Sequence, residues 1–193
     1  MILLASRSPQ RRALLGLLGV EFRVVPSAFA EHGPGDDARA RVEANARGKA
    51  RDVAAREGLP PGGAVLGADT EVVLDGRALG TPPDAAAAGA LLDALAGRAH
   101  EVVTAVVLVT GAGERTAVEA ARVHVRPLTP AVRSWYLATG EWRGRAGGYA
   151  VQGAGAALVT RVEGDHSAVV GLPLARVADM LAAAGLGPWP APQ

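Results

Sequence analysis

The segment Gly67-Ala68-Asp69-Thr70, with the hairpin that follows it, constrains this chain most strongly. Ala64-Val65-Leu66 predicts a short buried strand, and Asp69 is expected where that strand ends. Val72-Val73-Leu74 then leads into Asp75-Gly76, a strong hairpin signal. A carboxylate held by backbone on both sides suits a metal ligand or a general base. The alternative is that Asp69 only ends the strand and caps the turn.

Strand and helix patterns alternate along the chain, with hairpins between some of them. Helices are expected over residues 9–18, 38–57, 84–96, 130–139 and 173–184, and strands over 2–5, 21–25, 64–66, 72–74, 100–109, 114–126 and 156–162, with polar or glycine-rich loops at 26–37 and 140–155. This order predicts an α/β fold in which helices flank a mixed, twisted central sheet, with two lobes around a cleft. A single domain is expected over residues 1–186, followed by a Pro-rich tail over 187–193.

The composition excludes several classes of protein. The 193 residues are 49% hydrophobic and 20% charged, which indicates a globular chain with a sizeable core. A net charge of +1 gives no reason to expect nucleic-acid binding. The absence of cysteine excludes disulfides and thiolate chemistry, and fits a reducing compartment. No apolar run approaches the ~20 residues of a membrane span, and the N-terminal order is not that of a signal peptide, so a cytoplasmic protein without membrane contact is expected.

Several common site motifs are also absent. The chain has no G-x-x-x-x-G-K-[ST], no G-x-G-x-x-G between a strand and a helix, and no G-x-S-x-G, so P-loop, dinucleotide-binding and serine hydrolase functions are not supported. His100 and His124 are expected in strands as structural residues. His32 and His166 are expected in loops and have no partner at metal-ligand spacing.

The first helix has an unusual charge distribution. Ser8-Pro9 predicts its start, with Ser8 as N-cap and Pro9 at the first helical position. Gln10, Arg11 and Arg12 follow in the first turn, where cations oppose the helix dipole. An anion bound at the helix N-terminus would explain them. Exposed, solubilising charge is the alternative.

Lys49 is the one lysine among 20 basic residues. In a chain that otherwise uses arginine, a lysine indicates a need for a compact ammonium, as in phosphate binding, or else chance. Glu31 and Asp69 are hard oxygen ligands that suit Mg²⁺ or Mn²⁺, which also hold substrate oxygens. Taken together, these residues predict a site for a metal-bound polyphosphate. The residues expected to form it are Ser6, Ser8, Arg11, Glu31, Lys49, Asp69 and Gln152.

Blocks along almost the whole chain, to about Ala184, point to one family. They are Leu4-Ala5-Ser6, Ser8-Pro9-Gln10-Arg11, Glu31, Lys49-Ala50, Gly67-Ala68-Asp69-Thr70, Gly97-Arg98-Ala99-His100-Glu101-Val102, Arg126-Pro127-Leu128, Ala146-Gly147-Gly148-Tyr149-Ala150-Val151-Gln152-Gly153, Glu163-Gly164-Asp165 and Val170-Gly171-Leu172-Pro173-Leu174. In this order they resemble the Maf family of nucleoside triphosphate pyrophosphatases, related to the inosine-triphosphatase superfamily. Any one block would be weak evidence, whereas the series is specific.

The resemblance implies hydrolysis of a nucleoside triphosphate between its α- and β-phosphates. It implies Asp69 as the general base, and Glu31 with Asp69 as ligands of a divalent cation, Mg²⁺ or Mn²⁺. The phosphate-binding residues it implies are Ser6, Ser8, Arg11 and Lys49. A homodimer is a further expectation that comes from the family.

Substrate choice is also an expectation from the resemblance. The Gly-Ala-Asp-Thr form with a Tyr…Gln-Gly block resembles the branch that acts on dTTP, UTP and modified uridine triphosphates, and not the branch that acts on 7-methyl-GTP. Thr70 and Gln152 are therefore the expected specificity residues, since the Gln152 amide can read a pyrimidine edge.

Three departures from the family pattern leave an alternative open. Thr81 stands where the family has a lysine, with Arg77 as a candidate to compensate. Gln10 stands where the pyrimidine branch usually has Arg, at a position tied to specificity, and Gly144-Arg145 replaces an Asp-Lys pair. The alternative is a nucleotide-binding regulator with weak or no turnover, in line with the family's link to septum formation.

Overall fold

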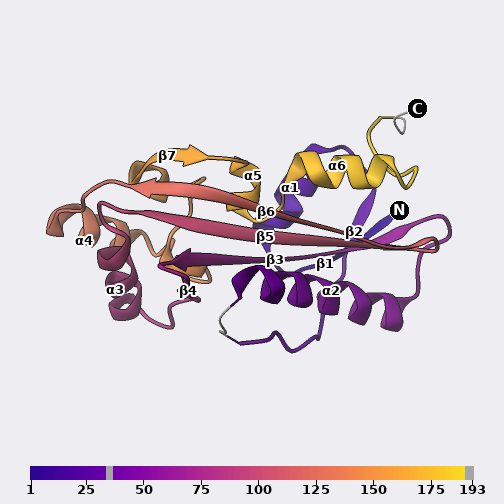
Figure 1. The fold of residues 1–193 in the computed structure, drawn as a ribbon, viewed down its shortest axis with the longest axis horizontal. Helices are drawn as coiled ribbons and strands as arrows, with labels where there is room; N and C mark the ends of the chain where they lie inside the picture. Colours follow the sequence, from indigo (N-terminus) through magenta and orange to yellow (C-terminus); the bar gives the residue numbers. More distant parts are fainter. Residues whose placement is uncertain (34–36, 190–193) are drawn as a thin grey trace.

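The computed structural model describes residues 1–33 and 37–189, which form a mixed sheet flanked by helices (Figure 1). Within these residues the sheet has seven strands: β1 (Ile2–Ala5), β2 (Phe22–Val24), β3 (Ala64–Leu74), β4 (Arg77–Ala78), β5 (Ala99–Thr110), β6 (Gly113–Val125) and β7 (Val159–Glu163). Their order is β2-β1-β3-β5-β6-β7, with β4 paired to β3. β1 runs parallel to β2 and β3, and the other pairs are antiparallel. The predicted mixed α/β sheet is confirmed.

The helices cover the sheet on both faces (Figure 1). They are α1 (Pro9–Leu17), α2 (Ala38–Glu57), α3 (Ala85–Leu95), α4 (Pro130–Thr139), α5 (His166–Val170) and α6 (Leu174–Ala182), with 3₁₀ turns η1 (Ala146–Gly148) and η2 (Ala154–Ala157). α2 lies along one face, and α1 and α6 lie on the other. The predicted N-cap of α1 is confirmed, because the Ser8 hydroxyl accepts a hydrogen bond from the Arg11 backbone N–H.

The two-residue period of the strands divides the core between these layers. Leu3, Val65 and Val107 pack in one apolar cluster with the buried side of α2. Leu4 and Leu66, one position along, belong to a second cluster with residues of α1 and α6. Val42 and Val53 of α2 are fully buried in the first cluster, and each such valine contributes roughly 1.5 kcal/mol, which holds α2 against the face of β3 that it covers.

The prediction that a strand ends at Asp69 is wrong. β3 runs without a break through Asp69, because β5 pairs with it continuously from Ala64 to Val73. On its other side β3 pairs with β1 only as far as Gly67, and its pairing with β4 begins at Val73. Residues 68–71 therefore have a strand partner on one side, and the sheet is open on the other.

Two other local predictions are corrected. Residues 156–158 were expected to begin a strand, but Ala156 and Leu158 donate backbone hydrogen bonds to Gly153 and Gly155, and β7 begins at Val159. His166 was expected in a loop and begins α5, whose N-cap is Asp165. Parts of the expected loop over 26–37 and tail over 187–193, namely residues 34–36 and 190–193, lie outside the described residues. None of the helices in the described ranges is long and apolar enough to cross a membrane.

Candidate active site

A cleft of about 750 Å³ opens where β1 ends and β3 continues. Every residue that the sequence analysis assigned to a site lies in its lining: Ser6, Ser8, Gln10, Arg11, Glu31, Lys49, Asp69, Thr70 and Gln152. They come from the β1–α1 turn, the first turn of α1, the loop before α2, α2, β3 and the loop after α4. The volume is in the range of small-molecule binding sites, so one small ligand could contact all of these segments.

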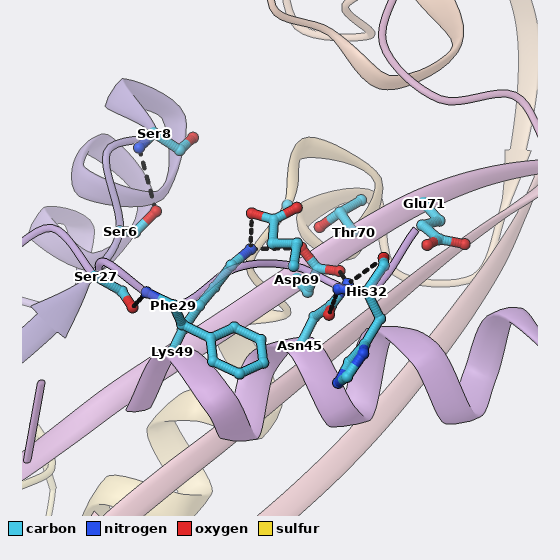
Figure 2. Close-up of polar contacts among 12 residues, drawn as sticks. Ser6, Ser8, Ser27, Phe29, His32, Asn45, Lys49, Asp69, Thr70 and Glu71 are labelled. Carbon is cyan, nitrogen blue, oxygen red and sulfur yellow. Dashed lines mark hydrogen bonds and ion pairs between the residues drawn. The ribbon is translucent and has the colours of Figure 1, made fainter. Parts of the chain in front are cut away.

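Lys49 lines this cleft, and its ammonium group lies beside Asp69 (Figure 2). Its Nζ is 2.7 Å from Asp69 Oδ1 and 2.7 Å from Glu31 Oε1. The Lys49 and Asp69 side chains are 10% and 9% exposed, whereas that of Glu31 is 57% exposed. The two carboxylates therefore converge on one cation, with Glu31 on the open side.

Two neighbouring contacts, which the sequence analysis missed, surround this group. Asn45 Nδ2 donates to Asp69 Oδ2 at 3.0 Å, and the Arg41 guanidinium forms an ion pair with Glu71. Arg41, Asn45 and Lys49 recur every fourth residue of α2, and Asp69 and Glu71 share one face of β3. Polar residues at these spacings were the sequence signal for a buried polar seam between the helix and the strand. We call Glu31, Lys49 and Asp69, which line the cleft, together with the buried Asn45 behind them, the α2 wall.

Thr70 and Arg11 meet on the other face of β3, since successive strand residues point to opposite faces. The Arg11 guanidinium donates to Thr70 Oγ1 at 3.0 Å, to the Gly171 carbonyl at 2.9 Å and to Ser6 Oγ at 3.4 Å. Burial lowers the pKa of Arg11 from its ordinary value, and the charges of Asp69 and Glu31 oppose this shift. Arg11 thus ties the β1–α1 turn to β3 and to the turn after α5.

The Thr70 hydroxyl is already used within the protein. Thr104 Oγ1 donates to the Ala168 carbonyl at 2.8 Å, so in the 2.9 Å contact between the two threonines Thr70 is the donor. Thr70 also accepts from Arg11. Its one proton is therefore not available to a ligand, although the side chain lines the cleft.

The serines at the start of α1 organise the turn itself. Ser6 Oγ accepts from the Ser8 N–H at 3.1 Å, and Ser8 Oγ donates to Gln10 Oε1 at 3.1 Å. Gln10 therefore supports the N-cap while lining the cleft. Pro9 has no backbone N–H, and the N–H groups of Arg11 and Arg12 bond to Ser8, so in this turn the Gln10 N–H, beside the Arg11 guanidinium, is the group placed to bind an anion.

The opposite side of the cleft is built by irregular chain. Gly147 N–H donates to the Gly80 carbonyl at 2.8 Å, which brings the 143–146 segment beside Thr81. We call Thr81, Arg143, Arg145 and Gln152 the loop wall; all four line the cleft. Among the described residues, neither Gln152 nor Thr81 has a side-chain hydrogen bond, and Arg145 Nε is buried without a partner. Arg77, the candidate to compensate for Thr81, is exposed and is not among the lining residues.

Buried groups behind the loop wall hold its backbone in place. The His100 ring Nε2 lies 2.7 Å from the Tyr149 hydroxyl, and the Tyr136 hydroxyl accepts from the Ala150 N–H at 3.1 Å. Burial lowers the pKa of His100 to about 4, with a smaller contribution from His124, so this ring is neutral at neutral pH. The Glu141 carboxylate accepts from the N–H groups of Ala154 and Gly155. The irregular segment is thus anchored at several points.

The α2 wall fits a divalent cation that is shared with a ligand. Within the described ranges no three His, Asp or Glu side chains gather as a complete metal site. The Lys49 ammonium shows, however, that oxygens of Glu31 and Asp69 can share a cation. Two carboxylates suit Mg²⁺ or Mn²⁺, which take their remaining ligands from water and substrate phosphates.

Comparisons with known proteins identify the family of this chain. The family described as Maf-like protein matches residues 1–184. This chain belongs to the Maf family. A relative from Anaeromyxobacter sp. (strain Fw109-5), named dTTP/UTP pyrophosphatase, is 49% identical over 99% of this chain and 93% of its own length. Relatives of the same name from Moorella thermoacetica and Deinococcus radiodurans are 47% and 45% identical, over 97% and 96% of this chain and 97% and 93% of theirs.

Proposed function

We propose that this Maf-family protein hydrolyses dTTP, UTP and modified uridine triphosphates to the nucleoside monophosphate and pyrophosphate. The observation that carries the proposal is the shared contact of Glu31 and Asp69 with Lys49, at the side of a cleft whose other residues can bind phosphate. The names of the relatives support this reaction and this substrate class. The cytoplasmic nucleotide pool is the setting we propose for it.

The roles follow from the chemistry of each side chain. Asp69 accepts the proton of the water that attacks the α-phosphorus, as the bond to the bridging oxygen of the β-phosphate breaks and pyrophosphate leaves. Arg11, the Gln10 backbone N–H and Lys49 bind the phosphates, and the two cations neutralise the charge that develops. Glu31 and Asp69 would hold Mg²⁺ or Mn²⁺, which supplies Lewis acidity and lowers the pKa of a bound water.

The loop wall supports recognition of the substrate. The Gln152 amide can both donate to and accept from a pyrimidine edge, and no described residue occupies it. Arg145, beside Thr81, supplies a cation on the side of the cleft where Thr81 has none. This argues for turnover over the alternative of a nucleotide-binding regulator. The homodimer stays a prediction, to be checked by analytical ultracentrifugation.

Pyrophosphate release with Mg²⁺ or Mn²⁺ tests the proposal directly. We would compare dTTP, UTP, 5-methyl-UTP, 7-methyl-GTP, ITP and dATP, with wild type beside Asp69→Asn. We expect turnover of the pyrimidine triphosphates that falls about a thousandfold or more in Asp69→Asn, which keeps the shape but not the base. Tight binding of a nucleotide without turnover by wild type would favour the regulator.

A further inference from the structure

We propose that Asn45 is a positioning residue, which holds the Glu31 loop and Asp69 in fixed register along α2. The inference rests on the proposed function for its catalytic consequence, but the geometry stands by itself. Asn45 is 2% exposed, and both the oxygen and the nitrogen of its side-chain amide form hydrogen bonds. Its Oδ1 accepts from the His32 N–H at 2.8 Å, and its Nδ2 donates to Asp69 Oδ2 at 3.0 Å (Figure 2).

Between Ser27 and His32, and apart from the Lys49–Glu31 ion pair, the loop that carries Glu31 is attached to one face of α2 at three points. At the first, Asp52 accepts from the Ser27 hydroxyl and from the Ala28 N–H, both at 2.8 Å. At the second, the Phe29 ring lies against Gly48, where a Cβ would overlap the ring. Asn45 makes the third attachment, at His32.

These attachment points share one face of the helix. Positions 45, 48 and 52 are spaced three and four residues apart, so they line up along α2, and Lys49 lies on the same face. The loop runs along the helix in the opposite direction, from Ser27 at Asp52 to His32 at Asn45. Glu31 is therefore held between the second and third attachments.

Asn45 differs from the other two attachments because it also contacts Asp69. The short, buried amide links the backbone next to Glu31 directly to the carboxylate that Glu31 must face across Lys49. Loss of this link would let the exposed Glu31 move relative to Asp69, while Lys49 and the phosphate-binding residues stayed in place. Groups that orient ligands in this way change rates by about tenfold or more when they are removed.

Two substitutions separate the two contacts. Asn45→Leu has a similar volume and removes both. Asn45→Asp keeps an oxygen that can accept from the His32 N–H, but at mildly alkaline pH it places a carboxylate against Asp69 where an N–H donor was. Val53→Ala is the matched control, because Val53 is fully buried on α2, about two turns beyond Asn45, and contacts neither carboxylate.

Three measurements on the full-length protein test the proposal: hydrogen exchange of the His32 amide, the ¹³C signal of the Asp69 carboxyl group, and kcat and KM for UTP. In Asn45→Leu we expect faster His32 exchange, a displaced Asp69 signal and a kcat about tenfold lower at nearly unchanged KM. In Asn45→Asp we expect His32 to stay protected while the Asp69 signal and kcat change. Val53→Ala should lower thermal stability and change none of the three.

The proposal would be overturned if folded Asn45→Leu kept the wild-type values of all three measurements: the His32 exchange rate, the Asp69 signal and kcat. Loss of kcat in Val53→Ala as large as in Asn45→Leu would overturn it too, because the effect would then be general loosening of α2. If wild type releases no pyrophosphate, the proposed function fails. The exchange rate and the carboxyl signal, which need no turnover, still decide whether Asn45 positions the two segments.

Discussion

The two sides of the cleft present their polar groups in opposite ways. On the α2 wall, Lys49, Asp69 and Asn45 are all paired with one another or with the adjoining loop. On the loop wall, Thr81, Gln152 and Arg145 Nε have no partner within the described ranges, although the backbone behind them is anchored. The first side belongs to a long helix and a central strand, and the second to irregular chain.

This difference separates the two tasks of a site. Groups that carry out a reaction gain from being held in place before the substrate arrives, because reorganisation then costs little. Groups that recognise a base must keep donors and acceptors open, and a loop can change them without disturbing the core. Four substitutions test this division, in order of the expected size of effect.

The largest effect is expected from Lys49→Met. It removes the cation between Glu31 and Asp69 and one phosphate-binding group, so kcat for UTP should fall about hundredfold to thousandfold. Steady-state kinetics on folded protein measures this. Arg51→Met on the same helix is the control, because it breaks only an exposed ion pair with Glu114 and should leave kcat unchanged. If Lys49→Met kept wild-type activity, the α2 wall would have no role in the chemical step.

The second effect concerns the support of the loop wall. His100 has a pKa of about 4 in the folded protein and an ordinary value of 6.5, so as pH falls the unfolded state takes up the proton first. The neutral His100 ring makes its full contribution to the free energy of unfolding above pH 6.5. Between pH 6.5 and pH 4 this contribution is lost, which lowers the free energy of unfolding by about 3 kcal/mol. Urea unfolding across this range should show a smaller pH dependence in His100→Gln than in wild type. His124→Gln, which removes the partly exposed histidine, should keep most of the pH dependence that wild type shows.

A gain is expected from Thr81→Lys. A cation added to the loop wall can form a charge-assisted bond to a phosphate, and kcat/KM for UTP should rise about tenfold. Arg77→Gln, in the same hairpin but outside the cleft lining, should change little. A loss in Arg77→Gln equal to the gain in Thr81→Lys would show instead that Arg77 reaches the substrate.

The smallest effect is expected from Gln152→Leu. Loss of one neutral, exposed amide should raise KM for UTP and dTTP severalfold and leave kcat nearly unchanged. ITP assayed with the same variant serves as the control, since a purine offers a different edge. An equal change for ITP would mean that Gln152 does not read the base.

Local chemistry was enough to predict much of this protein. The N-cap at Ser8, the bounds of α2, the hairpin at Asp75-Gly76 and the membership of Lys49 in a helix all follow from signals within a few residues. The lone lysine and the separated carboxylates also indicated the residues that line the cleft. The error at Asp69 has a clear origin: Gly67 and Asp69 are poor strand formers, and only the long pairing with β5 keeps β3 extended through them.

The sequence by itself determined which side chains carry charge, where the five longer helices begin to within one residue, and which family the blocks resemble. Only the tertiary structure decided which of these side chains meet. Lys49 touches both carboxylates because α2 packs along β3, and Asn45 reaches Asp69 and His32 for the same reason. Thr70 and Asp69, adjacent in the chain, are turned to opposite faces by the strand. Such contacts depend on packing between distant segments, which no local pattern encodes.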